Sequence, residues 1–391
     1  MSKAVLPSTT LPLFYGFIIY ISVQPILYWM VHKRFDQGHK IFFLGMMVVM
    51  SITILKNMSV IKDNLIIFLG IYMLWLINLG LNLNPIGKAT FAHFQPILLP
   101  VLGINFGYLI ARDRPDILAN IYSGSYKLGL ALSVIIISYF LLVQAGYIVY
   151  FGASSLIFIP IFWAFLEKKW TPFVLFILIL LLTGKRSSLL AVTAVLVLSV
   201  VRNIDSKSAL ILLGAPSCLL LGLELFSDIN SILFKRYETM IEALGSIDVL
   251  SLTLSANELN LLNEATSGRI NDFIGAANAL NQNSIFWLTG KGIGGTFQVI
   301  TTGPLWTTHY SHFTPISYVF LGGAILLIAF YSKLISLFVY SVKTIDDFYS
   351  MLFIYWFIMA LIGGAIYFTD PFIWLFVGVV VYKKRYKKYT R

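Results

Sequence analysis

The sequence is poor in charged residues. Of its 391 residues, 12% are charged and 58% are hydrophobic, whereas soluble domains average roughly 25% charged residues. Apolar runs long enough to cross about 30 Å of hydrocarbon recur along the whole chain. These runs are continuous rather than short and alternating, which excludes a transmembrane β-barrel. We therefore expect an all-α, polytopic helical membrane protein.

Cysteine and buried acidic residues are also scarce. Cys218 is the single cysteine and lies in a hydrophobic run, so no disulfide framework and no cysteine metal cluster can form within the chain. Glu224 and Asp370 lie only at the ends of predicted spans. Chains of buried carboxylates mark proton-coupled transporters, and their near absence disfavours a pump.

Most of the charge that is present is basic. The chain has 28 Lys and Arg against 17 Asp and Glu, a formal net charge of +11. In a soluble protein this excess would suggest nucleic acid. Cytoplasmic loops of membrane proteins also collect Lys and Arg, and this simpler explanation leads us to expect no nucleic-acid partner.

The apolar runs predict about twelve transmembrane helices in one transmembrane domain covering 1–391. Spans 172–183 and 371–382 are short for a full crossing, and 11–31 is too long for a signal-peptide core, so we expect it to be retained. The chain shows no internal repeat. The predicted spans are 11–31, 40–56, 65–82, 91–111, 127–144, 148–166, 172–183, 188–202, 209–225, 315–341, 349–367 and 371–382.

Basic segments predict the orientation. The tail 383–388 is the densest basic cluster and is expected in the cytoplasm. Segment 226–314 then becomes a long periplasmic loop inserted between two spans, and both termini are cytoplasmic. The turns at 32–34 and 185–186 are basic but fall on the opposite side. Counting spans backward from the tail puts further basic residues on the same side, at 112–114, 168–169, 202–207 and 343.

The long loop is expected to be partly helical, with helices at 230–244 and 267–280. Ser267 is the expected cap of the second helix, which leaves Arg269 in its first turn, where a cation opposes the helix dipole. Arg269 is therefore expected to have an anionic partner, and a surface ion pair with Asp272 or Glu264 is the alternative. The helical period places near one face Ile270, Phe273, Ile274, Ala277 and Leu280.

Two further segments carry candidate phosphate contacts. Arg186 can hold a phosphate by two parallel hydrogen bonds and Lys185 adds a point charge; snorkelling to lipid headgroups is the alternative. The glycine run 290–295 fits neither a Walker A loop nor a dinucleotide fingerprint. We expect it to form a close backbone turn, in which Lys291 offers another phosphate contact.

Two histidines, His309 and His312, lie just before the chain re-enters the membrane. Histidines three residues apart can bind a metal, but no acidic or cysteine partner stands out nearby, so we expect no metal and no cofactor. A single histidine that acts as a base or hydrogen-bond donor is favoured. A structural histidine at the membrane interface is the alternative.

Together these segments resemble the O-antigen polymerase and O-antigen ligase superfamily of bacterial envelope glycosyltransferases. The matching segments are Thr-Gly-Lys-Arg-Ser-Ser at 183–188, Ser-Gly-Arg at 267–269, the glycine run, His312 and the glycine pair 322–323. Phe313 follows the histidine where ligases usually have Asn, which favours a polymerase. Spaced Arg–Gly repeats described for some polymerases are not evident, which removes one argument for a polymerase.

The resemblance implies a metal-independent glycosyltransferase of the bacterial inner membrane, with its site on the periplasmic side. A polymerase transfers a glycan from undecaprenyl diphosphate to another lipid-linked repeat unit, whereas a ligase transfers it to lipid A core. A polysaccharide flippase is the alternative outside the enzymes, and the long loop disfavours it. Implied partners are membrane lipids, a chain-length regulator and a flippase of the same pathway.

The resemblance also implies roles for individual residues. Arg186, Arg269, Lys185 and Lys291 would bind the diphosphate. Arg186 and Arg269 would also act in catalysis together with His312, and His309 is the alternative histidine. If both arginines bind one diphosphate, they must converge although they lie far apart in the sequence.

Overall fold

The structure is a computed structural model of the chain. It describes residues 15–16, 18–19, 22–23, 45, 48, 50–55, 76, 88–147, 156–183, 185–202, 263, 269–299, 306–308, 311, 313–362 and 371–389. For 88–99, 186, 306, 362, 371–373 and 387–389 it describes the backbone alone. Most of the predicted spans 11–31, 40–56 and 65–82, all of 209–225, and the predicted helix 230–244 lie outside the described residues.

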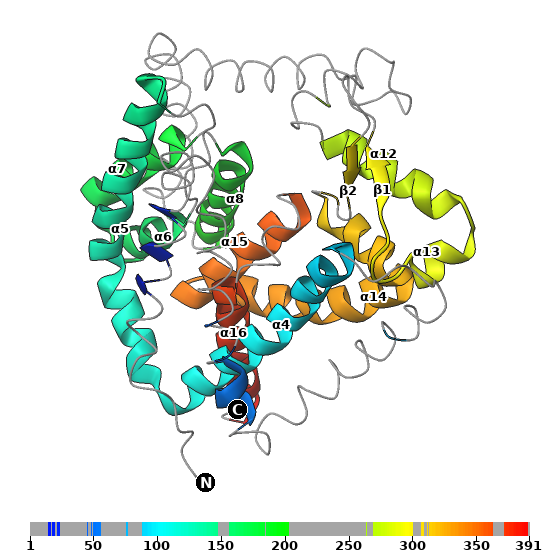
Figure 1. The fold of residues 1–391 in the computed structure, drawn as a ribbon. Coiled ribbons are helices and arrows are strands. Elements are labelled where there is room, and N and C mark those ends of the chain that lie inside the picture. Colours follow the sequence, from blue (N-terminus) through cyan, green and yellow to red (C-terminus); the bar gives the residue numbers. More distant parts are fainter. Residues whose placement is uncertain are drawn as a thin grey trace.

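Helices make up almost all of the described structure (Figure 1). Two short strands in the loop, β1 (Phe297–Val299) and β2 (Trp306–Thr308), pair antiparallel. The expected helical fold is therefore correct, and the loop adds a hairpin that the sequence did not predict. The helices are α4 (Lys88–Asp113), α5 (Pro115–Gln144), α6 (Phe158–Leu166), α7 (Trp170–Leu182), α8 (Arg186–Arg202), α12 (Arg269–Asn281), α13 (Ile285–Thr289), α14 (Thr314–Lys343), α15 (Phe348–Ile362) and α16 (Pro371–Tyr389).

Two of the described helices, α5 and α14, are long and apolar enough to cross a membrane. The apolar helix α7 has 13 residues, which at 1.5 Å per residue gives about 20 Å, less than the hydrocarbon thickness. The expectation of a short span at 172–183 is thus confirmed. The span predicted at 371–382 is longer than expected, because α16 continues through the basic tail to Tyr389.

The start of α5 was predicted wrongly. The helix begins at Pro115, and not at 127. Its first turns contain the polar residues Asp116, Asn120 and Ser123. These residues lower the mean hydropathy of the stretch, so it was not predicted as part of a span. Proline in the first helical turn is itself a start signal, because its ring fixes φ near the helical value and its missing N–H is not needed there.

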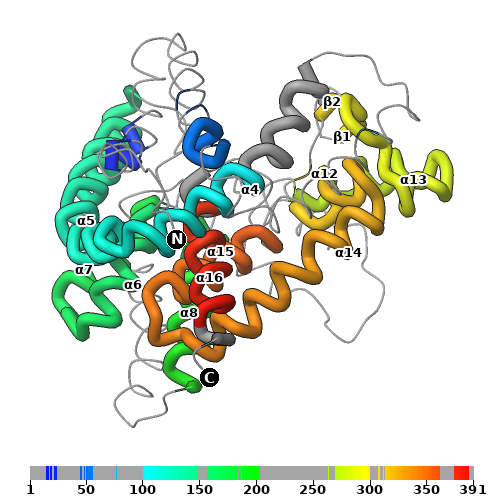
Figure 2. The backbone as a smooth tube through the Cα atoms, turned by 90° about the horizontal axis from the view of Figure 1, so that it is seen from below, coloured from blue at the N-terminus to red at the C-terminus, as the bar shows by residue number. Residues whose placement is uncertain are grey.

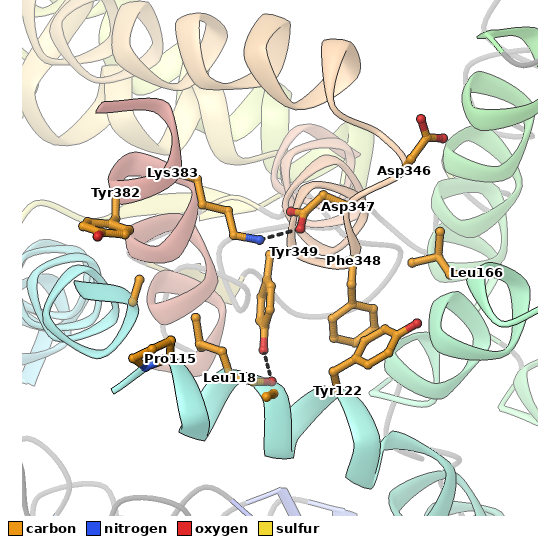
Figure 3. A pocket seen from close by; sticks show the side chains of 12 residues that line it. Pro115, Leu118, Tyr122, Leu166, Asp346, Asp347, Phe348, Tyr349, Tyr382 and Lys383 are labelled. Atoms are coloured by element: carbon orange, nitrogen blue, oxygen red, sulfur yellow. Dashed lines mark hydrogen bonds and ion pairs between the residues drawn. The ribbon is translucent and has the colours of Figure 1, made fainter. Parts of the chain in front are cut away.

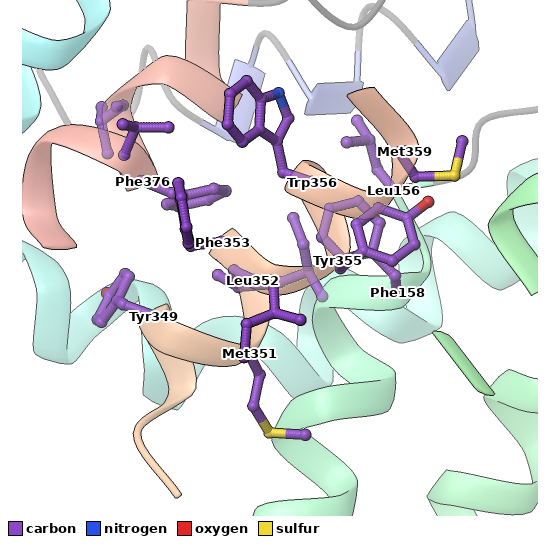
Figure 4. Close-up of a cluster of buried hydrophobic side chains, with 14 of the residues drawn as sticks. Leu156, Phe158, Tyr349, Met351, Leu352, Phe353, Tyr355, Trp356, Met359 and Phe376 are labelled. Atoms are coloured by element: carbon purple, nitrogen blue, oxygen red, sulfur yellow. The ribbon is translucent and has the colours of Figure 1, made fainter. Parts of the chain in front are cut away.

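Helix α15 lies at the centre of the large hydrophobic core of the helix bundle and is buried along its length. We call this core the membrane core, because it includes residues of the two membrane-length helices α5 and α14. Five successive residues, Met351 to Tyr355, are each 0% exposed. A helix that is hydrophobic all round belongs in the interior of a bundle. Figure 4 shows its aromatic side chains beside Phe158 of α6, and the rings of Phe158 and Tyr355 stack with centroids 3.8 Å apart. Helices α6, α8, α14 and α16 all pack against α15.

Helices α4 and α16 approach each other closely through glycine. A Cβ added to Gly107 would lie 2.0 Å from the carbonyl oxygen of Leu375. A Cβ added to Gly378 would lie 2.1 Å from the carbonyl oxygen of Ile104. Small residues at a membrane helix interface allow this backbone contact, so neither glycine can be enlarged without separating the two helices.

The basic segments that were predicted on one side do meet at one end of the bundle. Lys383 forms an ion pair with Asp347, and Arg202 donates a 3.0 Å hydrogen bond to the carbonyl oxygen of Val342. Tyr122, beside the Arg112–Arg114 segment, donates to Glu167 at 2.5 Å. We call this end the basic end; it comprises residues 112–122, 166–169, 202, 342–349 and 382–386.

Helix α14 is broken at Gly322 and Gly323, whose φ/ψ values are −142°/17° and 69°/−172°. Before the break, Ile316, Val319 and Phe320 pack with the loop residues Ala276, Ala279, Leu280, Phe297 and Val299 in a separate small core. After the break, residues from Leu326 to Leu337 join the membrane core. We call the residues around this small core the loop unit, which comprises 269–299, 306–308, 311 and 313–321.

Figure 2 shows α12, α13 and the hairpin gathered on one side of the molecule, with α5 and α7 on the opposite side. Within the loop unit, the predicted helix at 267–280 is confirmed as α12. Of the apolar residues predicted near one face, Leu280 is buried, whereas Phe273 is 40% exposed. The residues that α12 buries are Gly275, Ala276, Ala279 and Leu280. Small residues are needed there because a Cβ at Gly275 would lie 2.4 Å from the carbonyl oxygen of Gln298 on β1.

Candidate functional site

The turn between α7 and α8 carries Lys185, the first of the predicted phosphate-binding residues. Thr183 ends α7 and is buried, and its hydroxyl donates to the carbonyl oxygen of Leu180 at 2.6 Å. The N–H of Lys185 donates back to that hydroxyl oxygen at 3.3 Å. The carbonyl oxygen of Lys185 accepts the N–H of Leu189 at 3.1 Å. Lys185 therefore occupies the capping position of α8.

A lysine at this position is electrostatically unfavourable by itself. Helix N-termini carry the positive end of the helix dipole and favour anions, and Ser, Thr, Asp or Asn usually caps them. Burial of the Lys185 ammonium lowers its pKa to about 8, because desolvation disfavours the charged form. Among the described residues, no carboxylate forms an ion pair with it. An anionic ligand would relieve both penalties.

Ser188 adds a second polar group to the same turn. Its side chain is 0% exposed, and its Oγ has no hydrogen-bond partner among the residues that the structure describes. Lys185 and Ser188 are three residues apart and so lie on the same side of the helix start. Arg186 is the first residue of α8, while its side chain lies outside what the structure describes. The turn thus presents a buried ammonium and a buried hydroxyl at one helix N-terminus, an arrangement suited to an anion.

Arg269 occupies the first turn of α12, as the sequence predicted. It is half-buried, and the N–H of the nearby Asn271 donates to Asn263 Oδ1 at 3.2 Å. Glu264, one of the two carboxylates considered as its partner, lies outside the described residues. Asp272, the other, also belongs to the first turn of α12. There its negative charge interacts favourably with the helix dipole, whereas the positive charge of Arg269 interacts unfavourably with it.

The structure brings the Arg269 helix beside the segment that carries the histidines. Phe273 lies about one turn after Arg269, and its ring meets that of Phe313 edge to face, with centroids 5.9 Å apart. Phe313 directly follows His312 in the chain. His309 and His312 themselves lie outside the described residues, so their predicted roles stay predictions.

A serine between the two histidines fixes the backbone there. Ser311 is fully buried, and its N–H donates to Ser317 Oγ at 2.8 Å. The same hydroxyl donates to the carbonyl oxygen of Ser311 at 2.8 Å. Sequence reasoning missed this pair, although a Ser near the start of a helix is a recognised partner for nearby backbone groups. The pair fixes the histidine segment to the first turns of α14.

The glycine run forms the close backbone turn that was predicted. Gly290, Gly292 and Gly294 have φ values of 73°, 77° and 81°, a region that glycine adopts without steric cost. A Cβ on Gly290 would lie 2.6 Å from the backbone nitrogen of Gly322, and one on Gly323 would lie 1.9 Å from the carbonyl oxygen of Leu288. The run and α13 therefore sit directly against the break in α14.

Lys291 lies in this turn but is engaged with neutral groups of the loop unit. Its N–H donates to the carbonyl oxygen of Phe320 at 2.7 Å. Its Nζ donates to Gln282 Oε1 at 2.6 Å and lies 4.9 Å from the centre of the Phe286 ring. A diphosphate contact by Lys291 stays a prediction, and the contacts described here place its ammonium beside α12.

The structure does not describe contact between the two predicted arginine sites. Helix α12 packs against α13, α14 and β1, whereas α8 packs against α7 and α15. The predicted convergence of Arg186 and Arg269 on one diphosphate therefore stays a prediction. What the structure does bring together is Phe273, in the first turns of α12, and Phe313, which follows His312 in the chain.

Two cavities accompany these elements. One, of about 690 Å³, lies in the loop unit between α12 and the hairpin, and its described lining includes Asn278, Gln282 and Gln298. The other, of about 550 Å³, lies at the basic end and is lined by Asp346, Asp347 and Lys383 together with tyrosine rings. Figure 3 shows the Asp347–Lys383 ion pair across this second cavity, with Tyr349 donating to the carbonyl oxygen of Leu118. None of these lining residues was predicted as a site residue from the sequence, and Lys383 was considered only as part of the basic tail.

Comparison of the chain with known proteins finds no matching family model, no matching curated protein and no matching solved structure.

Proposed function

We propose that this protein is an O-antigen polymerase of the bacterial inner membrane. It transfers a glycan from undecaprenyl diphosphate to another lipid-linked repeat unit on the periplasmic side. The two membrane-length helices support an integral membrane protein. The gathering of basic segments at one end of the bundle supports a cytoplasmic basic end, and this orientation puts the loop unit and the α7–α8 turn at the periplasmic face.

One observation carries the proposal: the buried, cationic α7–α8 turn. A lysine without a carboxylate partner among the described residues, beside a buried hydroxyl with no partner, is costly unless an anion binds. A lipid diphosphate at the membrane surface supplies such an anion. In the proposed orientation the α7–α8 turn lies at the membrane boundary, where a polyprenyl carrier presents its phosphates.

The proposed reaction is a displacement at the anomeric carbon of the donor sugar. A hydroxyl oxygen of the acceptor glycan attacks this carbon, and the bond from the carbon to the diphosphate oxygen breaks. The electron pair leaves with undecaprenyl diphosphate. His312, with His309 as the alternative, accepts the hydroxyl proton as a general base. Lys185, Arg186 and Arg269 stabilise the charge that develops on the leaving diphosphate.

The test uses the lipopolysaccharide of the host bacterium. We expect a strain lacking the gene to make lipid A core with a single repeat unit and to lose longer chains. The intact gene should restore the ladder, whereas Lys185→Ala and Arg186→Ala should restore it poorly at equal membrane levels. Core without any repeat unit would contradict a polymerase and place the block at ligation or at flipping. An unchanged ladder would remove the protein from this pathway.

A further inference from the structure

The cavity between α12 and the β1–β2 hairpin has an unusual chemical lining. The described residues around it carry no charge. Five of them bear an amide or a hydroxyl, and all five side chains are exposed. They come from three places: Asn278 from α12 and Gln282 from the turn directly after it, Thr296 and Gln298 from β1 and its approach, and Thr307 from β2. We call this cavity the amide groove.

The groove is held in a fixed shape by the packing beneath it. Gly275, Ala279 and Phe297 also line it and are buried, so they form its floor. Gly275 allows α12 to lie directly on β1. In the hairpin, Gln298 and Thr307 are opposite each other in the register, which places two of the polar side chains side by side. The polar groups are therefore carried by elements with a common core.

Lys291 lies beside the groove and contacts one of the residues that line it. Its Nζ donates to Oε1 of Gln282 and lies over the Phe286 ring. This hydrogen bond occupies the carbonyl oxygen of the Gln282 amide, so the Nε2 group remains as the donor toward a ligand. Lys291 orients the amide in this way.

The hydrogen-bonding capacity of the lining selects a ligand class. Amides and hydroxyls both donate and accept, and so do the hydroxyls of a sugar. An anion would need donors only, preferably charged ones, and the carbonyl oxygens of Asn278 and Gln298 would repel it. A cavity of about 690 Å³ lies within the range of about 300–1,000 Å³ typical of ligand sites. We infer that the amide groove binds uncharged sugar residues of the glycan substrate.

This inference rests on the proposed function for the identity of the glycan, but binding can be measured without transfer. The probes are oligosaccharides released by mild acid from the cell's own surface polysaccharide, together with cellotetraose and cellotetraose ending in a glucuronate. Purified full-length protein in detergent is titrated with each probe, and the dissociation constant is obtained from saturation-transfer NMR. We expect the released oligosaccharide to bind at millimolar concentration or below. Failure to bind there overturns the inference.

The variants test whether this groove is the binding site. Asn278→Ala, Gln298→Ala and Thr307→Val each remove one hydrogen-bonding group, and we expect each to raise the dissociation constant by about five- to tenfold. Gln144→Ala removes an exposed amide at the end of α5, outside the groove, and should bind as the wild type does. Because all these side chains are exposed, the melting temperatures of the variant proteins should stay close to that of the wild type. Unchanged binding in all three groove variants overturns the inference.

Two comparisons separate this inference from neighbouring ones. If the glucuronate probe binds more tightly than cellotetraose and Lys291→Gln removes the difference, the ligand class is acidic sugars and the inference is wrong. Groove variants that bind poorly in a protein whose deletion leaves the polysaccharide ladder intact would support the groove and overturn the polymerase. Groove variants that bind the oligosaccharide and polymerise normally, in a protein whose deletion removes the long chains, would support the polymerase and overturn the groove as the binding site.

Discussion

Lys185 lies directly before α8, at a position where a short polar or acidic residue is usual. Its protonation state changes within an experimentally accessible pH range. Burial lowers its pKa to about 8 from the ordinary lysine value of 10.5. Between these two values the unfolded chain binds more protons than the folded protein. The free energy of unfolding contributed by this group therefore rises with pH across that window.

We predict that diphosphate affinity changes in the opposite direction. A bound diphosphate favours the charged ammonium, so the affinity should fall as the pH rises above about 8. The measurement is the dissociation constant of undecaprenyl diphosphate for the purified protein on both sides of that pH. Lys185→Arg keeps its charge throughout and should flatten this part of the profile. A wild-type profile that is already flat would rule out a contact between Lys185 and the diphosphate.

Ser188 leads to a separate prediction, because its buried hydroxyl has no hydrogen-bond partner within the described part of the chain. Ser188→Ala removes a desolvated group, so the free energy of unfolding should stay within about 1 kcal/mol of the wild type or increase. If the hydroxyl contacts the diphosphate, donor affinity should nevertheless fall about three- to tenfold. The control is Ser125→Ala, since Ser125 is equally buried but donates to the carbonyl oxygen of Ile121 at 2.8 Å. It should lose stability and keep affinity; the same response in both variants would contradict a ligand role for Ser188.

At the scale of the elements, the break in α14 joins the loop unit to the membrane core. Gly323 has a φ of 69° and no room for a side chain, since a Cβ would lie 1.9 Å from the carbonyl oxygen of Leu288. The N–H of Lys291 and the carbonyl oxygen of Phe320 tie the glycine run to the same place. The position of α13 and of the glycine run therefore depends on this one residue.

We predict that Gly323→Ala is more damaging than backbone strain alone would make it. A non-glycine residue at positive φ costs about 1–3 kcal/mol, and here the steric overlap with Leu288 is added. Gly146→Ala is the matched control, because Gly146 has a φ of 76° and nothing within 4 Å of an added Cβ. Thermal unfolding of both variants in detergent gives the comparison. Equal losses would mean that the contact between α13 and the break contributes nothing.

The sequence predicted where the helices lie better than it predicted which of their residues are buried. Continuous apolar runs were enough to find α7, α8, α14 and α15, because a span needs length and hydrophobicity. The buried face of α12 could not be found, because the small residues Gly275 and Ala276 become core only when β1 lies against them. The hairpin was missed for a related reason: its two three-residue strands carry too short a pattern to be read.

The candidate site was predictable only in part. Arg269 stood out because a cation at the start of a helix contradicts the local preference, and Lys185 stood out as a cation in a short turn between two apolar spans. The structure places both residues at helix starts. Ser188 and the amide groove did not stand out, because a serine or an amide is unremarkable until its burial and its neighbours are known. Such groups become meaningful through contacts between segments far apart in the chain.

For the whole molecule, the basic end fixes the orientation that we predict. Ser284, exposed at the start of α13, and Lys343, exposed at the basic end, provide two reporter positions in a Cys218→Ser background. A membrane-impermeant thiol reagent should label Ser284→Cys in cells whose outer membrane alone is permeable. Lys343→Cys should react only after the inner membrane is opened. The reverse pattern would invert the topology and remove the periplasmic placement of the α7–α8 turn.

The second prediction at this scale concerns the two arginines. Arg186 and Arg269 belong to helices that pack with different neighbours, so a shared diphosphate would have to bridge them. Arg186→Ala and Arg269→Ala should each cost transition-state stabilisation of about 2.7–4 kcal/mol, by analogy with loss of one oxyanion donor. If they act on one leaving group, the double variant should lose less than the sum. Rates of transfer from a purified lipid-linked donor provide the measurement, and strictly additive losses would indicate two separate functions.

The glycine break in α14 has a consequence for how the chain can change over time. In an unbroken helix, inserting one residue rotates everything beyond it by about 100°, so an insertion in the first half of α14 would turn its second half away from its neighbours. Here Ile316, Val319 and Phe320 before the break pack in the loop core, whereas Tyr318 and Leu321 already belong to the membrane core. The Tyr318 ring stacks on that of Phe330 across the break, so changes of length are expected in the loop before Thr314 and not within the first half of α14.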